Sequence, residues 1–189
     1  PSEGPASYAT GVSPAIMFAQ AQVTDVQFPA GSRNNVSPLK GEQVEISGDA
    51  LIVTATTTSG FYMTDLHCRR GTCPAMEGNV MPLANYFPDF GSIFVYTQSF
   101  PDHVDVGDRV CRVVGGVDEF PSSGTTQLKQ PLWDVEGSPL DSEDDNATSF
   151  ISCPDPVLPG FEVPPPVELT GAIIGDRDRM EAYESALVQ

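Results

Sequence analysis

The stretch 42-EQVEISGDALIVTATTTSGFYMTD-65 carries the strongest fold signal in the chain. Its first part, residues 42–58, is rich in β-branched side chains, which fit strands better than helices. Gly48 interrupts this run, and a glycine inside a strand pattern indicates a bulge or a sharp bend. A second run, with aromatic residues, follows at 59–65. The stretch therefore predicts two successive strand segments, the first of them bent near its middle.

Three further runs of the same character follow, at residues 91–98, 104–120 and 125–137. Turn signals separate them, and helical periodicity is almost absent, which is typical of an all-β barrel or sandwich. We predict that residues 42–137 form a mostly antiparallel five-stranded barrel. The expected interior residues are Val44, Ile46, Ile52, Phe61, Met63, Ile93, Val95, Val110 and Val113.

The regions on either side of the barrel differ from it in composition. The expected organisation is an extended N-terminal lead-in with a short strand (1–35), the barrel (36–137), an acidic and proline-rich linker (138–170), and a short helix with the start of a following module or assembly contact (171–189). The short strand is expected within 21–29, where Val23 and Val26 are interspersed with polar residues. The helix is expected from about Asp176 to Ser185.

The charge balance narrows the set of partners. The chain has 26 acidic and 9 basic residues, a formal net charge of −17. Such a surface repels nucleic acid and anionic lipid, whereas divalent cations or basic partners are attracted to it. A saline habitat would select the same composition. The sequence contains no run of about 18 consecutive apolar residues, so we expect no membrane span.

The four cysteines indicate an oxidising compartment. Zinc sites usually combine close cysteine pairs, whereas here only Cys68 and Cys73 are near each other in sequence. Two disulfides fit this spacing better than a metal site or free thiols, and four cysteines allow three pairings. The short spacing favours Cys68–Cys73, which leaves Cys111–Cys153. We therefore expect a secreted, extracellular protein.

Five segments in a fixed order resemble a known module: SPLKGEQVEISGDALIVTA, GFYMTD, GSIFVYT, VDVGDRVCRVVGGVDEF and TTQL. They are similar to an accessory module of secreted bacterial nucleases and other large extracellular proteins. The similarity covers about residues 36–130 and implies an OB-fold-like barrel that precedes an endonuclease/exonuclease/phosphatase domain. The metal-binding Asn, Glu, Asp and His set of those nucleases has no counterpart in this chain.

Two candidate sites stand out, and each has a simpler structural explanation. Tyr62, Phe94 and Tyr96 could line a binding face of the barrel, or could be core residues of half-buried strands. The segment 141–146 offers oxygen ligands for Ca²⁺ from Asp141, Glu143 and Asp145, with Asp144 between them. It lacks the glycine and the final glutamate of an EF-hand, and a solvated acidic loop would look the same. Beyond this calcium alternative we expect no cofactor.

The sequence also lacks the common catalytic motifs, including Gly-x-Ser-x-Gly, His-Glu-x-x-His and the Walker loop. We therefore expect no enzyme and no nucleic-acid binding, but a non-catalytic secreted module that acts through protein–protein contacts in a multidomain extracellular protein. Its partners would be neighbouring domains or subunits. One alternative is a structural subunit of a filament or surface assembly, which self-assembles through the terminal segments 1–35 and 150–189. Another is an accessory fragment of a secreted nuclease or phosphodiesterase.

Overall fold

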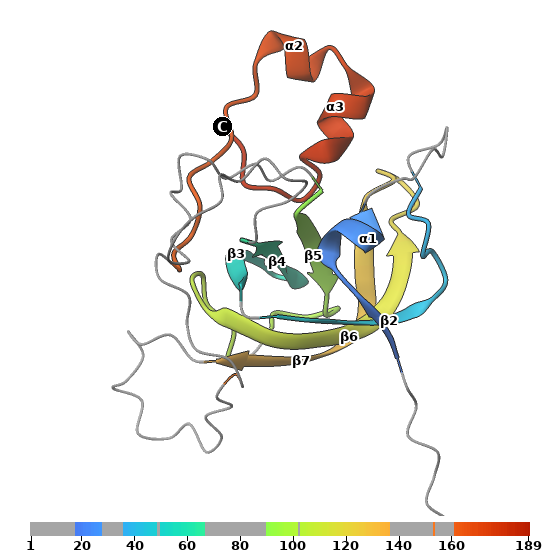
Figure 1. Cartoon of the computed structure of the whole chain (residues 1–189), viewed down its shortest axis with the longest axis vertical. Coiled ribbons are helices and arrows are strands. Elements are labelled where there is room, and N and C mark those ends of the chain that lie inside the picture. The colour runs from blue at the N-terminus through green and yellow to red at the C-terminus, as the bar shows by residue number, and fades with distance from the viewer. Residues whose placement is uncertain are drawn as a thin grey trace, which may run out of the picture.

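The computed structural model describes residues 18–27, 36–48, 50–66, 90–101, 103–136, 153 and 161–189. Strands dominate, with short helices near the two ends of the described chain (Figure 1). In chain order the elements are β1 (Ala19–Ala21), α1 (Val23–Gln27), β2 (Gln43–Ser47), β3 (Leu51–Thr57), β4 (Gly60–Asp65), β5 (Ser92–Tyr96), β6 (Arg109–Glu119), β7 (Thr126–Glu136), α2 (Gly171–Ile174) and α3 (Arg177–Ala182).

The strands close into a five-stranded barrel. Neighbouring strands are β3–β4, β4–β5, β5–β7, β7–β6 and β6–β3, and only the β5–β7 pair within this ring is parallel. Strand β2 also pairs with β6, so β2 and β3 act as one bent strand along the same neighbour. This connectivity confirms the predicted all-β, OB-like barrel. The predicted break at Gly48 falls between β2 and β3.

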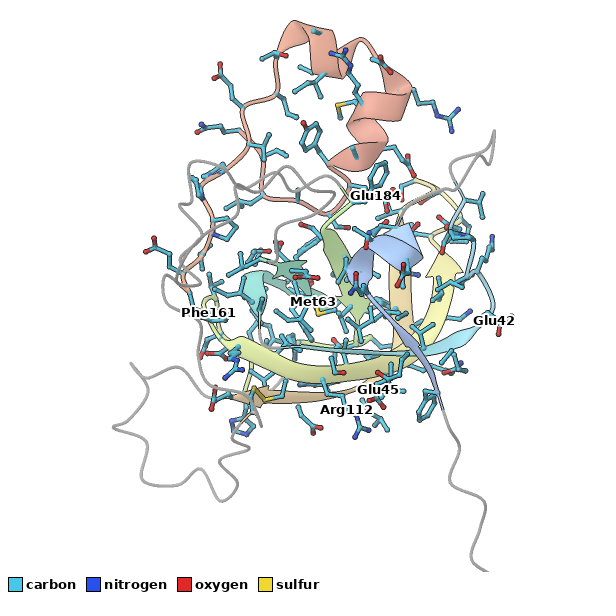
Figure 2. All side chains as sticks on the ribbon, viewed as in Figure 1. Glu42, Glu45, Met63, Arg112, Phe161 and Glu184 are labelled. Carbon is cyan, nitrogen blue, oxygen red and sulfur yellow. A yellow bond between two sulfur atoms is a disulfide. The ribbon has the colours of Figure 1, made fainter. Side chains whose placement is uncertain are left out.

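The barrel interior is one apolar cluster, and Met63 lies inside it (Figure 2). Eight of the nine residues expected in the interior belong to this cluster, but Ile52 does not. The break after β2 reverses the alternation of the strand, so that Leu51 and Val53 point inward instead of Ile52. Ile52 is still fully buried, in a second cluster with Ala50 and Leu66. The prediction for Ile52 was therefore wrong about the face but right about burial.

The N-terminal segment also differs from the prediction of a strand within 21–29. The strand is β1, which ends at Ala21 and pairs in parallel with β2, and helix α1 follows it directly. The Gln22 backbone N–H donates to Asp25 Oδ2 at 2.8 Å, as in the return bond of a capping box. Val23 and Val26, one helical turn apart, are fully buried in the barrel core. The spacing of three between these valines is thus a helix signal.

Residues 161–189 form a unit that we call the C-terminal lobe. It contains α2 and α3, which stand off the barrel at the top of Figure 1. The helix expected at 176–185 is present in shorter form as α3, and α2 was not predicted. Val167 and Val188 form a parallel bridge, so the segments before α2 and after α3 lie side by side. No helix in the described part of the chain is long and apolar enough to cross a membrane.

Candidate functional site

The best candidate site is a row of three aromatic rings on the outside of the barrel. Tyr62 of β4 is the register partner of Phe94 of β5, and Tyr96 lies two residues further along β5. The ring centroids of Tyr62 and Phe94 are 4.7 Å apart, and those of Phe94 and Tyr96 are 6.3 Å apart. All three side chains are partly exposed. We call these three residues the aromatic row.

The row lies outside the barrel because of strand alternation. Phe61 and Met63 flank Tyr62, and Ile93 and Val95 flank Phe94; these four are fully buried in the core. Successive side chains of a strand point to opposite faces, so Tyr62 and Phe94 point away from the core. The alternative that these rings are core residues of half-buried strands therefore does not describe them.

Gly60 makes room for the row. Its register partner is Tyr96, and the ring of Phe94 covers it diagonally. A Cβ atom at Gly60 would lie 2.8 Å from Cζ of Phe94 and 2.1 Å from the carbonyl oxygen of Val95. Both distances are too short for any side chain. The glycine thus leaves room for the ring of Phe94, which lies beside both tyrosines.

The strand next to the row adds no unpaired positive charge. Lys129 of β7 is the register partner of Tyr96, and its Nζ donates to Oδ2 of Asp118 at 2.7 Å. This hydrogen bond from the Lys129 ammonium holds the pKa of the Asp118 carboxyl below its ordinary value. The cation that the register places beside the row is therefore already paired with an anion.

The chain's own proline-rich segment covers the adjacent part of the same outer face of β4 and β5. Thr64 and Ser92 are register partners two residues beyond Tyr62 and Phe94, and their hydroxyl oxygens are 2.7 Å apart. Together with Pro164, Pro165, Val167, Ala186 and Leu187 they line a narrow gap with room for about 10 Å³ of water. Pro164 is buried there. The outer face of β4 and β5 thus carries a proline-rich segment at one end and the aromatic row beside it.

The start of the C-terminal lobe is anchored by apolar contacts. Phe161 and Val163 pack against the second apolar cluster, which includes Ile52 and Leu66. Phe161 lies at the side of the barrel, away from the lobe's helices (Figure 2). This contact explains why Ile52 is buried although it points away from the barrel interior.

A polar contact anchors the other end of the lobe. The Thr126 backbone N–H donates to Oε1 of Glu184, and the Thr126 hydroxyl donates to Oε1 of Glu119 at 2.9 Å. Glu119 Oε1 also accepts from the Ser37 backbone N–H at 2.8 Å. Figure 2 shows Glu184 between the lobe's helices and the barrel strands. Two carboxyl groups therefore approach a single residue of β7.

Burial raises the pKa of Glu184 to about 8, from an ordinary value of 4.5. The hydrogen bond from Thr126 acts in the opposite direction, and the neighbouring carboxylates of Glu181 and Glu119 raise the pKa further. The carboxyl of Glu184 is thus mostly protonated at neutral pH. Nothing in the sequence pointed to this residue, because 58 positions separate Glu184 from Thr126.

Of the other candidate residues, the structure describes only one disulfide. Cys111 of β6 is bonded to Cys153, with their Cα atoms 5.0 Å apart. Cys68 and Cys73 lie outside the described residues, as do Asp141, Glu143 and Asp145, so the short disulfide and the calcium site stay predictions. Within the described ranges no group of three or more His, Cys, Asp or Glu side chains is placed to hold a metal ion.

The barrel thus presents three features that could bind another molecule or be regulated: the aromatic row, the covered proline-rich segment and the carboxyl pair at Thr126. The similarity to the nuclease-associated module remains a prediction from sequence segments. Comparison of the chain with protein-family models, with curated proteins and with solved structures found no match in any of the three.

Proposed function

We propose that this chain is a non-catalytic module of an extracellular protein, and that it binds a partner protein through the aromatic row. The observation that carries the proposal is the row itself: three partly exposed rings on the outer face of β4 and β5, with Phe94 beside both tyrosines. Aromatic side chains that are kept at a surface supply large contact areas at low entropic cost, and they are enriched where proteins bind each other.

The charge distribution favours a protein partner over nucleic acid. Non-specific binding to nucleic acid depends on neutralising phosphates with Lys and Arg. The chain has 9 such residues against 26 acids, and Lys129 beside the row is held by Asp118. The Cys111–Cys153 disulfide supports an extracellular location, because disulfides persist in oxidising compartments.

A peptide selection tests this function and does not require that the partner be identified first. A library of random linear peptides would be selected on the intact chain, and enriched peptides would then be measured against a Tyr62→Ala/Tyr96→Ala double variant. Leu132→Ala is the matched control, since Leu132 is a strongly exposed apolar residue of β7 outside the row. We expect enriched peptides to bind the wild type and the Leu132→Ala variant but not the double variant. No enrichment, or equal binding to all three proteins, would contradict the proposal.

A second candidate function is a structural subunit of an extracellular assembly. It is favoured by β1, which adds a strand to the sheet from the N-terminal segment and pairs in parallel with β2. The same pairing between two copies would link them by strand addition. Particle mass in solution across a range of concentrations tests it, and a constant mass of one chain at every concentration would rule it out.

A further inference from the structure

The chain's own contacts suggest which class of partner fits the aromatic row. Pro164 and Pro165 line a narrow gap together with Thr64 and Ser92. Thr64 and Ser92 lie on the same outer face of β4 and β5 as the row, two residues from Tyr62 and Phe94. Proline fixes its own φ and favours the same φ range as polyproline II, an extended helix without internal hydrogen bonds. The face that carries the row is therefore already compatible with a proline-rich segment at its neighbouring position.

The dimensions of the row fit a segment of this kind. The first centroid step, 4.7 Å, runs across β4 and β5, and the second, 6.3 Å, runs along β5. The three rings thus cover a patch comparable in size to one turn of polyproline II, which has three residues and rises about 9 Å. One turn of such a segment can thus lie across all three rings. Aromatic-lined grooves of other folds bind proline-rich segments in the same manner, and the segment loses little conformational entropy on binding.

The polar atoms of the row are also suited to this ligand. Polyproline II leaves its backbone carbonyls without internal donors, and each tyrosine hydroxyl can donate one hydrogen bond. Tyr62 lies beside Phe94 across the strand pair and Tyr96 lies beside it along β5, so the row carries two such hydroxyls. Because Lys129 is paired with Asp118, it does not attract an anionic ligand to the row.

We propose that the aromatic row binds a proline-rich segment of a partner protein in the polyproline II conformation, beside the position taken by the chain's own Pro164 and Pro165. This inference rests on the function proposed above, because it names the chemistry of the partner that the row would bind. A sugar ring could also stack on these aromatic side chains, and nucleic acid bases could do so too. These ligands are alternative outcomes of the test.

The test uses the intact chain, labelled for NMR, and a decaproline peptide, with a glycine–serine peptide of the same length as the flexible control. We expect decaproline to shift amide resonances of β4 and β5 around the row, and the glycine–serine peptide to leave them in place. Removing one ring with Tyr62→Ala or Tyr96→Ala should weaken binding about tenfold. Leu132→Ala should leave it unchanged, and Tyr96→Phe should weaken it several-fold because a donor is lost.

The inference is overturned if millimolar decaproline leaves the row unshifted, if both peptides bind alike, or if a glucose oligomer or single-stranded DNA shifts the row while decaproline does not. Its failure can be told apart from that of the proposed function. If selected peptides bind the row but contain no proline-rich sequences, only the inference fails. If neither selected peptides nor decaproline reach the row, both fail.

Discussion

Replacing Glu184 by Gln should remove a pH dependence from the docking of the C-terminal lobe. The Gln side chain keeps an oxygen that can accept the Thr126 backbone N–H, but it cannot ionise. In the wild type, burial raises the pKa of Glu184 to about 8, and Glu119 and Glu181 add like charge nearby. The docked lobe therefore favours the protonated acid, whereas the undocked lobe leaves it in water.

The sign follows from the two pKa values. Below the ordinary value of 4.5 the carboxyl is protonated in both states, so the docking free energy is at its most favourable. Between 4.5 and about 8 only the docked form keeps the proton, and docking weakens by about 1.4 kcal/mol for each pH unit. The full interval sets an upper limit of about 5 kcal/mol. Solvent reaches the partly exposed carboxyl and screens part of this free energy. We therefore expect docking of the lobe to weaken by on the order of 2 kcal/mol over the interval.

Hydrogen exchange at two backbone amides measures this docking directly. The Phe90 N–H donates to the Ala182 carbonyl oxygen at 2.7 Å, and the Thr126 N–H donates to Glu184. After correction for intrinsic rates, protection of both amides in the wild type should fall steadily from pH 5 to pH 8. In the Glu184→Gln variant it should stay nearly level. Glu168→Gln is the control, since it removes an exposed carboxylate from the same lobe.

Equal pH dependence in the wild type and in Glu184→Gln would refute the reasoning. A Glu168→Gln variant that levels the profile as strongly would also refute it, because general repulsion among the acids would then explain the effect.

The other predictions concern the disulfide, the glycine under the row and nucleic acid. Replacing Cys111 and Cys153 by serine should lower the free energy of unfolding in urea by about 4 kcal/mol, because the bond closes a loop with a sequence separation of 42. An unchanged urea midpoint would contradict this prediction. Gly60→Ala should lower the free energy of unfolding by about 2 kcal/mol or more, and with it the thermal midpoint. Gly171→Ala is the control and should not lower the midpoint, because no atom lies within 4 Å of its Cβ. Equal midpoints for the two variants would count against the close packing of Phe94. Labelled single- and double-stranded DNA should show no micromolar binding by anisotropy at low salt, with or without Ca²⁺ or Mg²⁺, and salt-sensitive binding or cleavage would restore the nuclease interpretation.

The barrel strands were predictable because their signals are local. Alternation and turn residues lie within a few positions of each other, and the runs at 91–98, 104–120 and 125–137 each contain the observed strand. The face assignment failed at Ile52 because it depends on how many residues form the bend before β3. Helix α1 was missed because a five-residue element offers only Val23 and Val26 as a pattern, and one pair of apolar residues is too few to establish a period.

The candidate site was predictable only in part. The sequence named Tyr62, Phe94 and Tyr96, since aromatic residues at alternate positions suggest one face of a sheet. Their contact depends on the register between β4 and β5, which the sequence does not specify. The contact between Glu184 and Thr126 could not be predicted, because it forms between distant segments that carry no shared pattern.

The disulfide between Cys111 and Cys153 also determines how the barrel would carry tension. Cys111 lies near the start of β6, and the bond bypasses the chain between the two cysteines, including all of β7. Once the lobe's noncovalent contacts with the barrel were broken, a pull on the C-terminal lobe would therefore enter the barrel through the sulfur atoms into β6, and not through the end of β7. Strand β7 holds β5 and β6 together, so peeling it from its free end would open the barrel. The bond shields that strand, and the module would resist stretching until β6 itself slides past its neighbours.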